Sequence, residues 1–210
     1  MRWRRKIEGL KPFTSDQTTL PWEAPPGLGA HLVEECEKWL KSHLARSGEE
    51  AVGGASTLPS DYRSYLQEIP LTAHFYMDVV FAVEPMPALD DGRDALSSLC
   101  GCDINRGTEI IAKNENYNAS YKGTHASDIF DDHFIIGESW GNFPIVLKLT
   151  EPRRGSIALW DRYSPMKDEV GQEIPRLPDE SGSDKGNIYR VADSFSAFIG
   201  SLRKEGDLGA

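Results

Sequence analysis

Alternation of apolar and polar positions is densest in the segment 133–165. An apolar run at 134–136 is followed by a polar, turn-prone stretch, and every second residue from 143 to 149 is then apolar. The pattern resumes at 156–161 after a turn at 151–155 that contains Pro and Gly. A period of two is typical of strands that bury one face more deeply than the other. The region therefore predicts three consecutive antiparallel strands.

Weaker strand patterns occur elsewhere in the chain. Apolar residues alternate with others over 73–81, at Ala73, Phe75, Met77, Val79 and Phe81, which predicts a strand with His74 on its solvated face. The polar segment 105–123 contains 110–112 as one possible short strand, and 188–191 predicts a last edge strand. The segment 163–186 is rich in Pro, Gly, Ser and acids and predicts a long loop.

Helical periodicity marks other segments. An apolar stripe recurs at steps of three and four residues within 28–46: Leu32, Cys36, Trp39, Leu40 and Leu44. The segment 59–69 also has helical spacing and ends at a proline. A short helix at 90–99, capped by Asp90 or Asp91, and a final helix capped by Asp193 are further predictions. Residues 1–27 contain four prolines and predict an extended arm, and 49–57 reads as a linker.

Length and composition describe an ordinary globular chain. Its 210 residues, 39% apolar and 27% charged, suffice for one substantial core. No apolar run approaches the roughly 18 residues of a membrane span, and the basic start lacks a hydrophobic stretch, so neither a membrane partner nor a secretion signal is expected. Three cysteines are too few and too clustered for a disulfide framework. Cytoplasmic residence is the expectation.

Charge is distributed unevenly along the chain. Residues 1–57 hold eight basic and eight acidic residues, whereas 58–210 hold fifteen basic and twenty-five acidic ones, and 15 minus 25 gives the whole net charge of −10. An acidic surface repels nucleic-acid phosphates and attracts cationic proteins, so a basic protein is the expected partner and nucleic acid is not. The simpler explanation is that the acidity maintains solubility.

Several short motifs follow one another in a recognisable order between residues 58 and 203. They are Leu-Pro-x-x-Tyr at 58–62, an apolar-apolar-Gly step ending at Gly137, a Gly-Asn turn at 141–142, a strand ending in Trp160-Asp161, and Ser-Phe-x-x-Phe at 194–198. This series resembles the SUKH superfamily, which includes fungal cell-wall synthesis regulators and bacterial immunity proteins that neutralise polymorphic toxins. One departure is Gln67–Pro70, where the family commonly has Asn-Gly-Gly after its opening helix.

The resemblance implies an architecture and a function. It implies an α+β domain at 58–210, whose mixed, mainly antiparallel sheet is flanked by the helices 59–69 and 193–203, with 1–57 as an added N-terminal arm and amphipathic helix. It also implies a non-catalytic immunity protein that binds a cognate bacterial toxin domain and uses no cofactor. The acidity would suit a basic toxin such as a nuclease. A regulatory or scaffold protein of the same fold is the alternative, and the oligomeric state stays open.

Residues in and beside the central strands are candidates for partner contact, because aromatic side chains often anchor interfaces while surrounding charges set the association rate. The candidates are Asp128, Asp131, Asp132, Glu138, Trp140, Trp160 and Asp161. Trp140 lies in a predicted turn, where no core role is required of it. For Trp160, packing in the core is at least as good an interpretation.

Three patterns in the sequence suggest catalysis or metal binding, and each lacks a required part. Gly137-x-Ser139-x-Gly141 has the spacing of a hydrolase nucleophile elbow, but a β pattern follows it where the elbow requires a helix. Cys100 and Cys102 lack the second ligand pair of a zinc site. The acidic run before His133 lacks the Gly and Asn of a calcium loop. The sequence therefore favours recognition over catalysis, with no metal.

Overall fold

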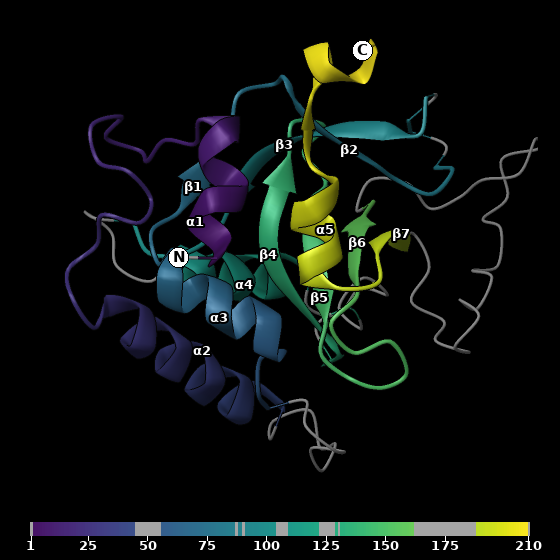
Figure 1. Ribbon diagram of the computed structural model, residues 1–210. Coiled ribbons are helices and arrows are strands. Elements are labelled where there is room, and N and C mark those ends of the chain that lie inside the picture. Colours follow the sequence, from purple (N-terminus) through teal and green to yellow (C-terminus); the bar gives the residue numbers. More distant parts are fainter. Residues whose placement is uncertain are drawn as a thin grey trace, which may run out of the picture.

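A curled antiparallel sheet with helices packed against it forms the architecture of the chain (Figure 1). The computed structural model describes residues 2–44, 56–86, 88–89, 91–103, 109–121, 129, 131–161 and 188–209. The chain is an α+β protein, as the sequence predicts. The predicted loop at 163–186 and the candidate Asp128 lie outside the described residues.

The three strands predicted from the densest alternation lie in the middle of the sheet. They are β4 (His133–Ser139), β5 (Pro144–Lys148) and β6 (Ile157–Trp160), and each pairs antiparallel with the next. The strand order is β7-β6-β5-β4-β3-β2-β8, and all strand pairs among the described residues are antiparallel. The outer strands are β2 (Val79–Ala82), β3 (Arg93–Leu99), β7 (Ile188–Ala192) and β8 (Arg203–Lys204), and β1 (Ala73–His74) also pairs with β3.

The sheet curls until its two ends approach each other. The Glu84 amide, just after β2, donates to the Arg190 carbonyl of β7 at 2.9 Å, and the Arg190 amide donates to Glu84 Oε2 at 3.1 Å. These bonds occupy polar backbone groups on the β7 edge that would otherwise be available to another chain.

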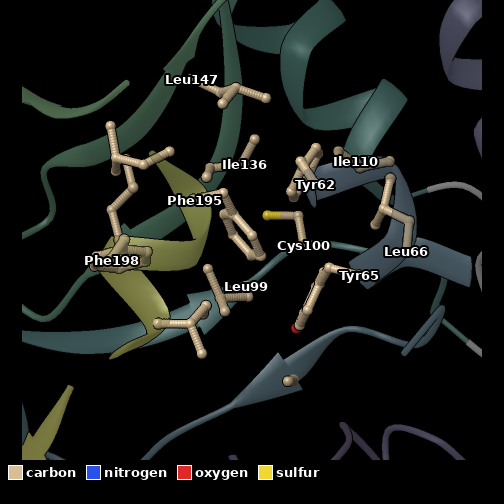
Figure 2. Close-up of a cluster of buried hydrophobic side chains, with 14 of the residues drawn as sticks. Tyr62, Tyr65, Leu66, Leu99, Cys100, Ile110, Ile136, Leu147, Phe195 and Phe198 are labelled. Atoms are coloured by element: carbon tan, nitrogen blue, oxygen red, sulfur yellow. The ribbon is translucent and has the colours of Figure 1, made fainter. Parts of the chain in front are cut away.

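The main core lies between the sheet and four helices, α1 (Arg2–Ile7), α2 (Leu28–Leu44), α3 (Ser60–Glu68) and α5 (Phe195–Ser201). Figure 2 shows Tyr62, Cys100 and Phe195 facing one another in this core. The aromatic rings pack closely, with Phe195 centred 4.8 Å from Tyr62 and 4.9 Å from Tyr65. A smaller cluster, Ile129, Ile135, Val146, Ala158 and Trp160, covers the opposite face of β4–β6. These strands are therefore buried on both faces.

The N-terminal segment contributes to the same core as the rest of the chain. Arg2–Ile7 is a helix where the prolines predicted an extended arm, and Trp3 is fully buried against Tyr65 and Phe195. The Glu68 carboxylate accepts from the Trp3 and Arg4 amides at 3.2 and 3.0 Å. Amides of a first helical turn lack partners within the helix, so this acid stabilises α1 from outside it.

Two predictions between residues 90 and 123 were wrong. The segment predicted as a helix at 90–99 is strand β3, because it pairs with β2 on one side and β4 on the other. The segment predicted to hold a strand at 110–112 is helix α4 (Glu109–Tyr121). Its fully buried residues, Ile110 and Asn114, are four apart, and Ile111 and Tyr117 on either side of them are partly buried against the two core clusters.

Two smaller differences from the predictions concern the strand at 73–81 and the N-terminal cap of the final helix. The strand predicted over 73–81 is two strands, β1 and β2, separated by a turn in which the Val79 amide donates to the Tyr76 carbonyl at 3.1 Å. The final helix is capped by Ser194 and not by Asp193: Ser194 Oγ accepts from the Ala197 amide at 3.1 Å. The helices predicted at 28–46 and 59–69 are confirmed as α2 and α3.

Candidate functional site

Trp140 is held at the surface by the turn between β4 and β5. Its amide donates to the Ala95 carbonyl at 2.8 Å, which extends the β3–β4 ladder by one residue. Asn142 then takes a left-handed conformation with φ of 61°, as Asn does more readily than most residues. The Ser139 amide donates to the Phe143 carbonyl at 3.0 Å and closes the turn. The backbone is thus fixed while the Trp140 side chain remains 46% exposed.

The Trp140 indole contacts the turn between β1 and β2, on the far side of β3. Its Nε1 donates to the Phe75 carbonyl at 3.2 Å, at the peptide bond that leads into Tyr76. Tyr76 and Met77 are 59% and 64% exposed. Among the described residues, these two, Trp140 and Leu20 are the exposed large hydrophobic side chains. Tyr76 and Met77 directly follow Phe75, so three of the four lie within two residues of the contact between Trp140 and Phe75.

Phe13 of the N-terminal segment extends this surface. Phe13 and His74 exchange backbone hydrogen bonds of 3.1 and 2.8 Å. The Phe13 ring lies 4.9 Å from that of Tyr76 and 5.7 Å from that of His74. We call Phe13, His74, Tyr76, Met77 and Trp140 the aromatic patch. His74 is half-buried in it, so the prediction of a solvated histidine was wrong, and burial lowers its pKa.

Glu138 and Trp160 lie at the same end of the sheet as Trp140 but are covered by α4. Glu138 Oε2 lies 2.8 Å from Lys113 Nζ, and Glu138 Oε1 accepts from the Tyr117 hydroxyl at 2.7 Å. The Tyr117 ring is 6.1 Å from that of Trp160, which is 3% exposed. Trp160 therefore packs in the smaller core cluster, the alternative weighed for it from the sequence.

Two of the acidic candidates, Asp131 and Asp132, lie at the opposite end of the sheet. Asp132 precedes β4 at its opposite end, about 26 Å from Trp140 at the usual rise of roughly 3.3 Å per residue. It pairs with His133 and, at 3.3 Å, with Lys148, and both of these partners are buried. Asp131 is half-buried beside it, and Asp161 is 2% exposed. Of the six candidates that are described, Trp140 is the exposed one.

Ser139 has the surroundings of a structural serine. It is 2% exposed, its Oγ accepts from the Phe143 amide at 3.2 Å, and its hydroxyl bonds to Asp94. Strand β5 follows it, without the helix of a nucleophile elbow. Within the described residues, no hydrogen bond joins Ser139 to a histidine. These contacts hold the β4–β5 turn.

The cysteines are buried and their thiols are poor nucleophiles. Burial raises the pKa of Cys36 and Cys100 to about 12 and that of Cys102 to about 11. The thiolate is the reactive form of cysteine, and these values keep it scarce at neutral pH. In the part of the chain that the structure describes, no group of three His, Cys, Asp or Glu side chains is placed to hold a metal ion.

One open groove of about 660 Å³ lies between α2 and α3. Val33 supplies apolar surface to it, and Glu37 pairs with Arg63 across it. The groove is distant in sequence from every candidate residue and holds no convergent set of catalytic groups. It marks where the two helices diverge.

Four members of the aromatic patch, Phe13, His74, Tyr76 and Met77, were not among the contact residues predicted from the sequence. Alternation placed Met77 on the buried face, yet it is the most exposed of the four exposed hydrophobic residues. The turn at 76–78 interrupts the alternation and turns Met77 outward. The signal was the Asp at 78 next to Met77, because Asp is common in turns and rare in strands. Nothing in the local pattern connects Phe13 to this turn.

Comparisons of the chain with protein families, curated proteins and solved structures return no match. Among the described residues, no helix combines the length and hydrophobicity that crossing a bilayer requires.

Proposed function

We propose that this chain is a non-catalytic immunity protein of the cytoplasm, which binds a cognate bacterial toxin domain and blocks its active site. The motif series at 58–203 and the surplus of acidic residues there support the proposal. A basic toxin domain, such as a nuclease, is the partner that this charge favours.

The observation that carries the proposal is the exposure of Trp140 beside Tyr76 and Met77. Burying a large aromatic side chain on folding is favourable, and most of the aromatic side chains that the structure describes are buried. An aromatic group left outside on a rigid turn is available to another protein, and Trp and Tyr are the residues that most often dominate binding energy at interfaces. Exposed apolar side chains of this kind serve binding, and we therefore assign Trp140, Tyr76 and Met77 no catalytic role.

The test is co-purification of the chain with the C-terminal domain of a large secreted toxin encoded by a neighbouring reading frame. We expect a stable complex in which the toxin activity is lost. Unchanged neutralisation by the Ser139→Ala variant, with circular dichroism confirming that it is folded, would exclude the hydrolase alternative. Because Ser139 Oγ also holds the turn that carries Trp140, a loss of neutralisation is followed by an ester-hydrolysis assay of the unaltered chain. Hydrolysis that depends on Ser139 would favour the hydrolase alternative. If no such domain binds, the proposed immunity function is wrong.

A further inference from the structure

The aromatic patch combines exposed rings with a fixed backbone. Trp140 is anchored through its amide to Ala95 and through its indole to Phe75. Tyr76 is supported by the Phe13 ring at 4.9 Å. Side chains held in this way lose little conformational freedom when a partner covers them, which favours binding. The faces of these rings can accept a cation as well as apolar groups.

Carboxylates border the patch on two sides. Asp16 lies three residues from Phe13, and Asp103 accepts from Ser15 Oγ at 2.8 Å. Hydrogen bonds, first from Thr14 Oγ1 and then from the Thr18 and Thr19 amides, hold the pKa of Asp16 well below its ordinary value. Asp16 is therefore charged at any working pH.

On the other side, Asp78 follows Met77 and Asp94 lies against the turn that carries Trp140. Cations on the neighbouring strands offset these acids only in part. Lys204 Nζ is 3.8 Å from Asp78, and Arg93 is the exposed cation of β3. Lys11, two residues before Phe13, and the pair Glu109 and Lys113, which act on His74, also belong to this border. Counting the five carboxylates (Asp16, Asp78, Asp94, Asp103 and Glu109) against the four cations (Lys11, Arg93, Lys113 and Lys204) leaves a formal charge of 4 − 5 = −1.

We propose that the aromatic patch is the docking surface of the chain, and that its partner presents a cationic polypeptide segment whose arginine or lysine side chains lie on the exposed rings. The inference rests on the proposed function for the identity of the partner, but the surface is defined by its own chemistry. An aromatic platform with an acidic border attracts a cation by charge and holds it through the ring faces and through apolar contact with the side-chain stem. Nucleic acid would be repelled by the same border.

The first experiment uses a peptide probe, so that it does not depend on finding a toxin. The full chain, labelled with ¹⁵N, is titrated with a short peptide of alternating arginine and leucine, and with a control peptide in which glutamate replaces arginine. The Trp140 indole resonance is identified through the Trp140→Phe variant. We expect it to shift with the arginine peptide alone. Shifts that are absent at Trp140, or a concentration-dependent shift without peptide, would overturn the proposal, the latter by indicating a second copy of the chain as occupant.

Variants then separate the patch from acidity in general. Trp140→Ala should weaken binding of the arginine peptide about tenfold or more, the loss typical of a central interface residue. Tyr76→Ala should also weaken it, and among the described residues the Tyr76 hydroxyl makes no hydrogen bond that this variant would remove. Leu20→Ala removes another exposed hydrophobic residue outside the patch and should leave affinity unchanged. Equal affinity of all three folded variants would overturn the proposal.

A second arm distinguishes the two proposals. The same variants are measured against the toxin domain that co-purifies with the chain. If that domain binds Trp140→Ala as tightly as the unaltered chain, the docking surface is wrong and the immunity function stands. If the arginine peptide binds the patch and no toxin domain binds the chain, the surface stands and the immunity function is wrong.

Discussion

The side-chain amide of Asn114 makes the hydrogen bonds to β4 that a neighbouring strand would otherwise make. It is fully buried on α4, where its Oδ1 accepts from the Ile135 amide at 2.8 Å and its Nδ2 donates to the Ile135 carbonyl at 2.9 Å. The next backbone bond along β4 runs from the Cys100 amide to the Ile136 carbonyl. Beyond that point the side-chain amide replaces the peptide group of β3, so a polar residue is required inside α4.

Asn114→Ala should therefore destabilise the fold strongly. The substitution leaves the buried amide and carbonyl of Ile135 without these partners, and one unsatisfied buried group costs about 1–3 kcal/mol. We expect a loss of about 3 kcal/mol in the free energy of unfolding, measured by urea titration. Asn116→Ala, at an exposed position of the same helix, should change it by less than about 0.5 kcal/mol. Similar values for the two variants would contradict the strand-replacing role.

His74, a member of the aromatic patch, should make the folding stability of the chain depend on pH. Burial lowers its pKa from the ordinary value of 6.5; Glu109 and Asp103 oppose this and Lys113 adds to it. The unfolded chain therefore takes up a proton before the folded chain does, and stability falls as the pH drops below about 6.5. His74→Gln should reduce this fall between about pH 6.5 and pH 5, measured by urea unfolding, whereas His31→Gln, at an exposed site on α2, should not. An unchanged pH profile in His74→Gln would contradict the assignment.

At the scale of elements, α2 and α3 approach so closely that a glycine is required between them. A Cβ at Gly29 would lie 2.5 Å from the Gln67 carbonyl oxygen, and this neighbour is backbone. At Gly200 in α5 a Cβ would meet nothing within 4 Å. A change from Gly to Ala would therefore cause a backbone clash at position 29 and none at position 200.

Gly200→Ala should stabilise the chain by about 0.5–1 kcal/mol, because alanine restricts the unfolded chain and favours the helix. Gly29→Ala should destabilise it, because a gain of at most about 1 kcal/mol cannot offset a clash that forces α2 away from α3, for which overpacking costs of about 1–3 kcal/mol are typical. Urea midpoints of the two variants, compared under the same conditions, check the signs. Stabilisation by both would contradict the close approach of α2 and α3.

The sequence predicted those elements in which the buried positions are apolar and recur at the spacing of a strand or a helix. Strands β4–β6 and helices α2 and α3 have apolar residues at the spacing of a strand or a helix, so local pattern sufficed. Strand β3 and helix α4 could not be predicted in this way. The segment 93–99 is a strand because β2 and β4 pair with it, and α4 buries a polar residue, Asn114, that reads as solvent-exposed.

The candidate site was predictable in one respect only. Trp140 could be identified because it falls in a turn between two strong strands, where no core position is available. Asp132 and Trp140 were grouped because both lie near β4, but the length of that strand places them at opposite ends. Tyr76, Met77 and Phe13 join Trp140 through the register of β1 with β3 and of Phe13 with His74, which are pairings between distant parts of the chain.

At the scale of the whole molecule, the net charge of −10 and the aromatic patch should control different steps of binding. Long-range attraction acts while two proteins are apart, so it sets the association rate, whereas rings covered in the complex set the dissociation rate. Raising the ionic strength from about 0.01 M to about 1 M shortens the screening length from about 30 Å to about 3 Å. The association rate of the proposed basic toxin domain should then fall by about tenfold or more.

Stopped-flow mixing of the chain with that domain separates the two steps. Trp140→Ala should raise the dissociation rate by about tenfold or more and leave the salt dependence of association unchanged, because it removes a contact and no charge. Asp78→Asn should lower the association rate at low salt with a smaller effect on dissociation, because it removes a border charge. An association rate that is the same at both salt concentrations would show that the acidic surplus does not guide the partner, and the charge argument for a basic toxin would be lost.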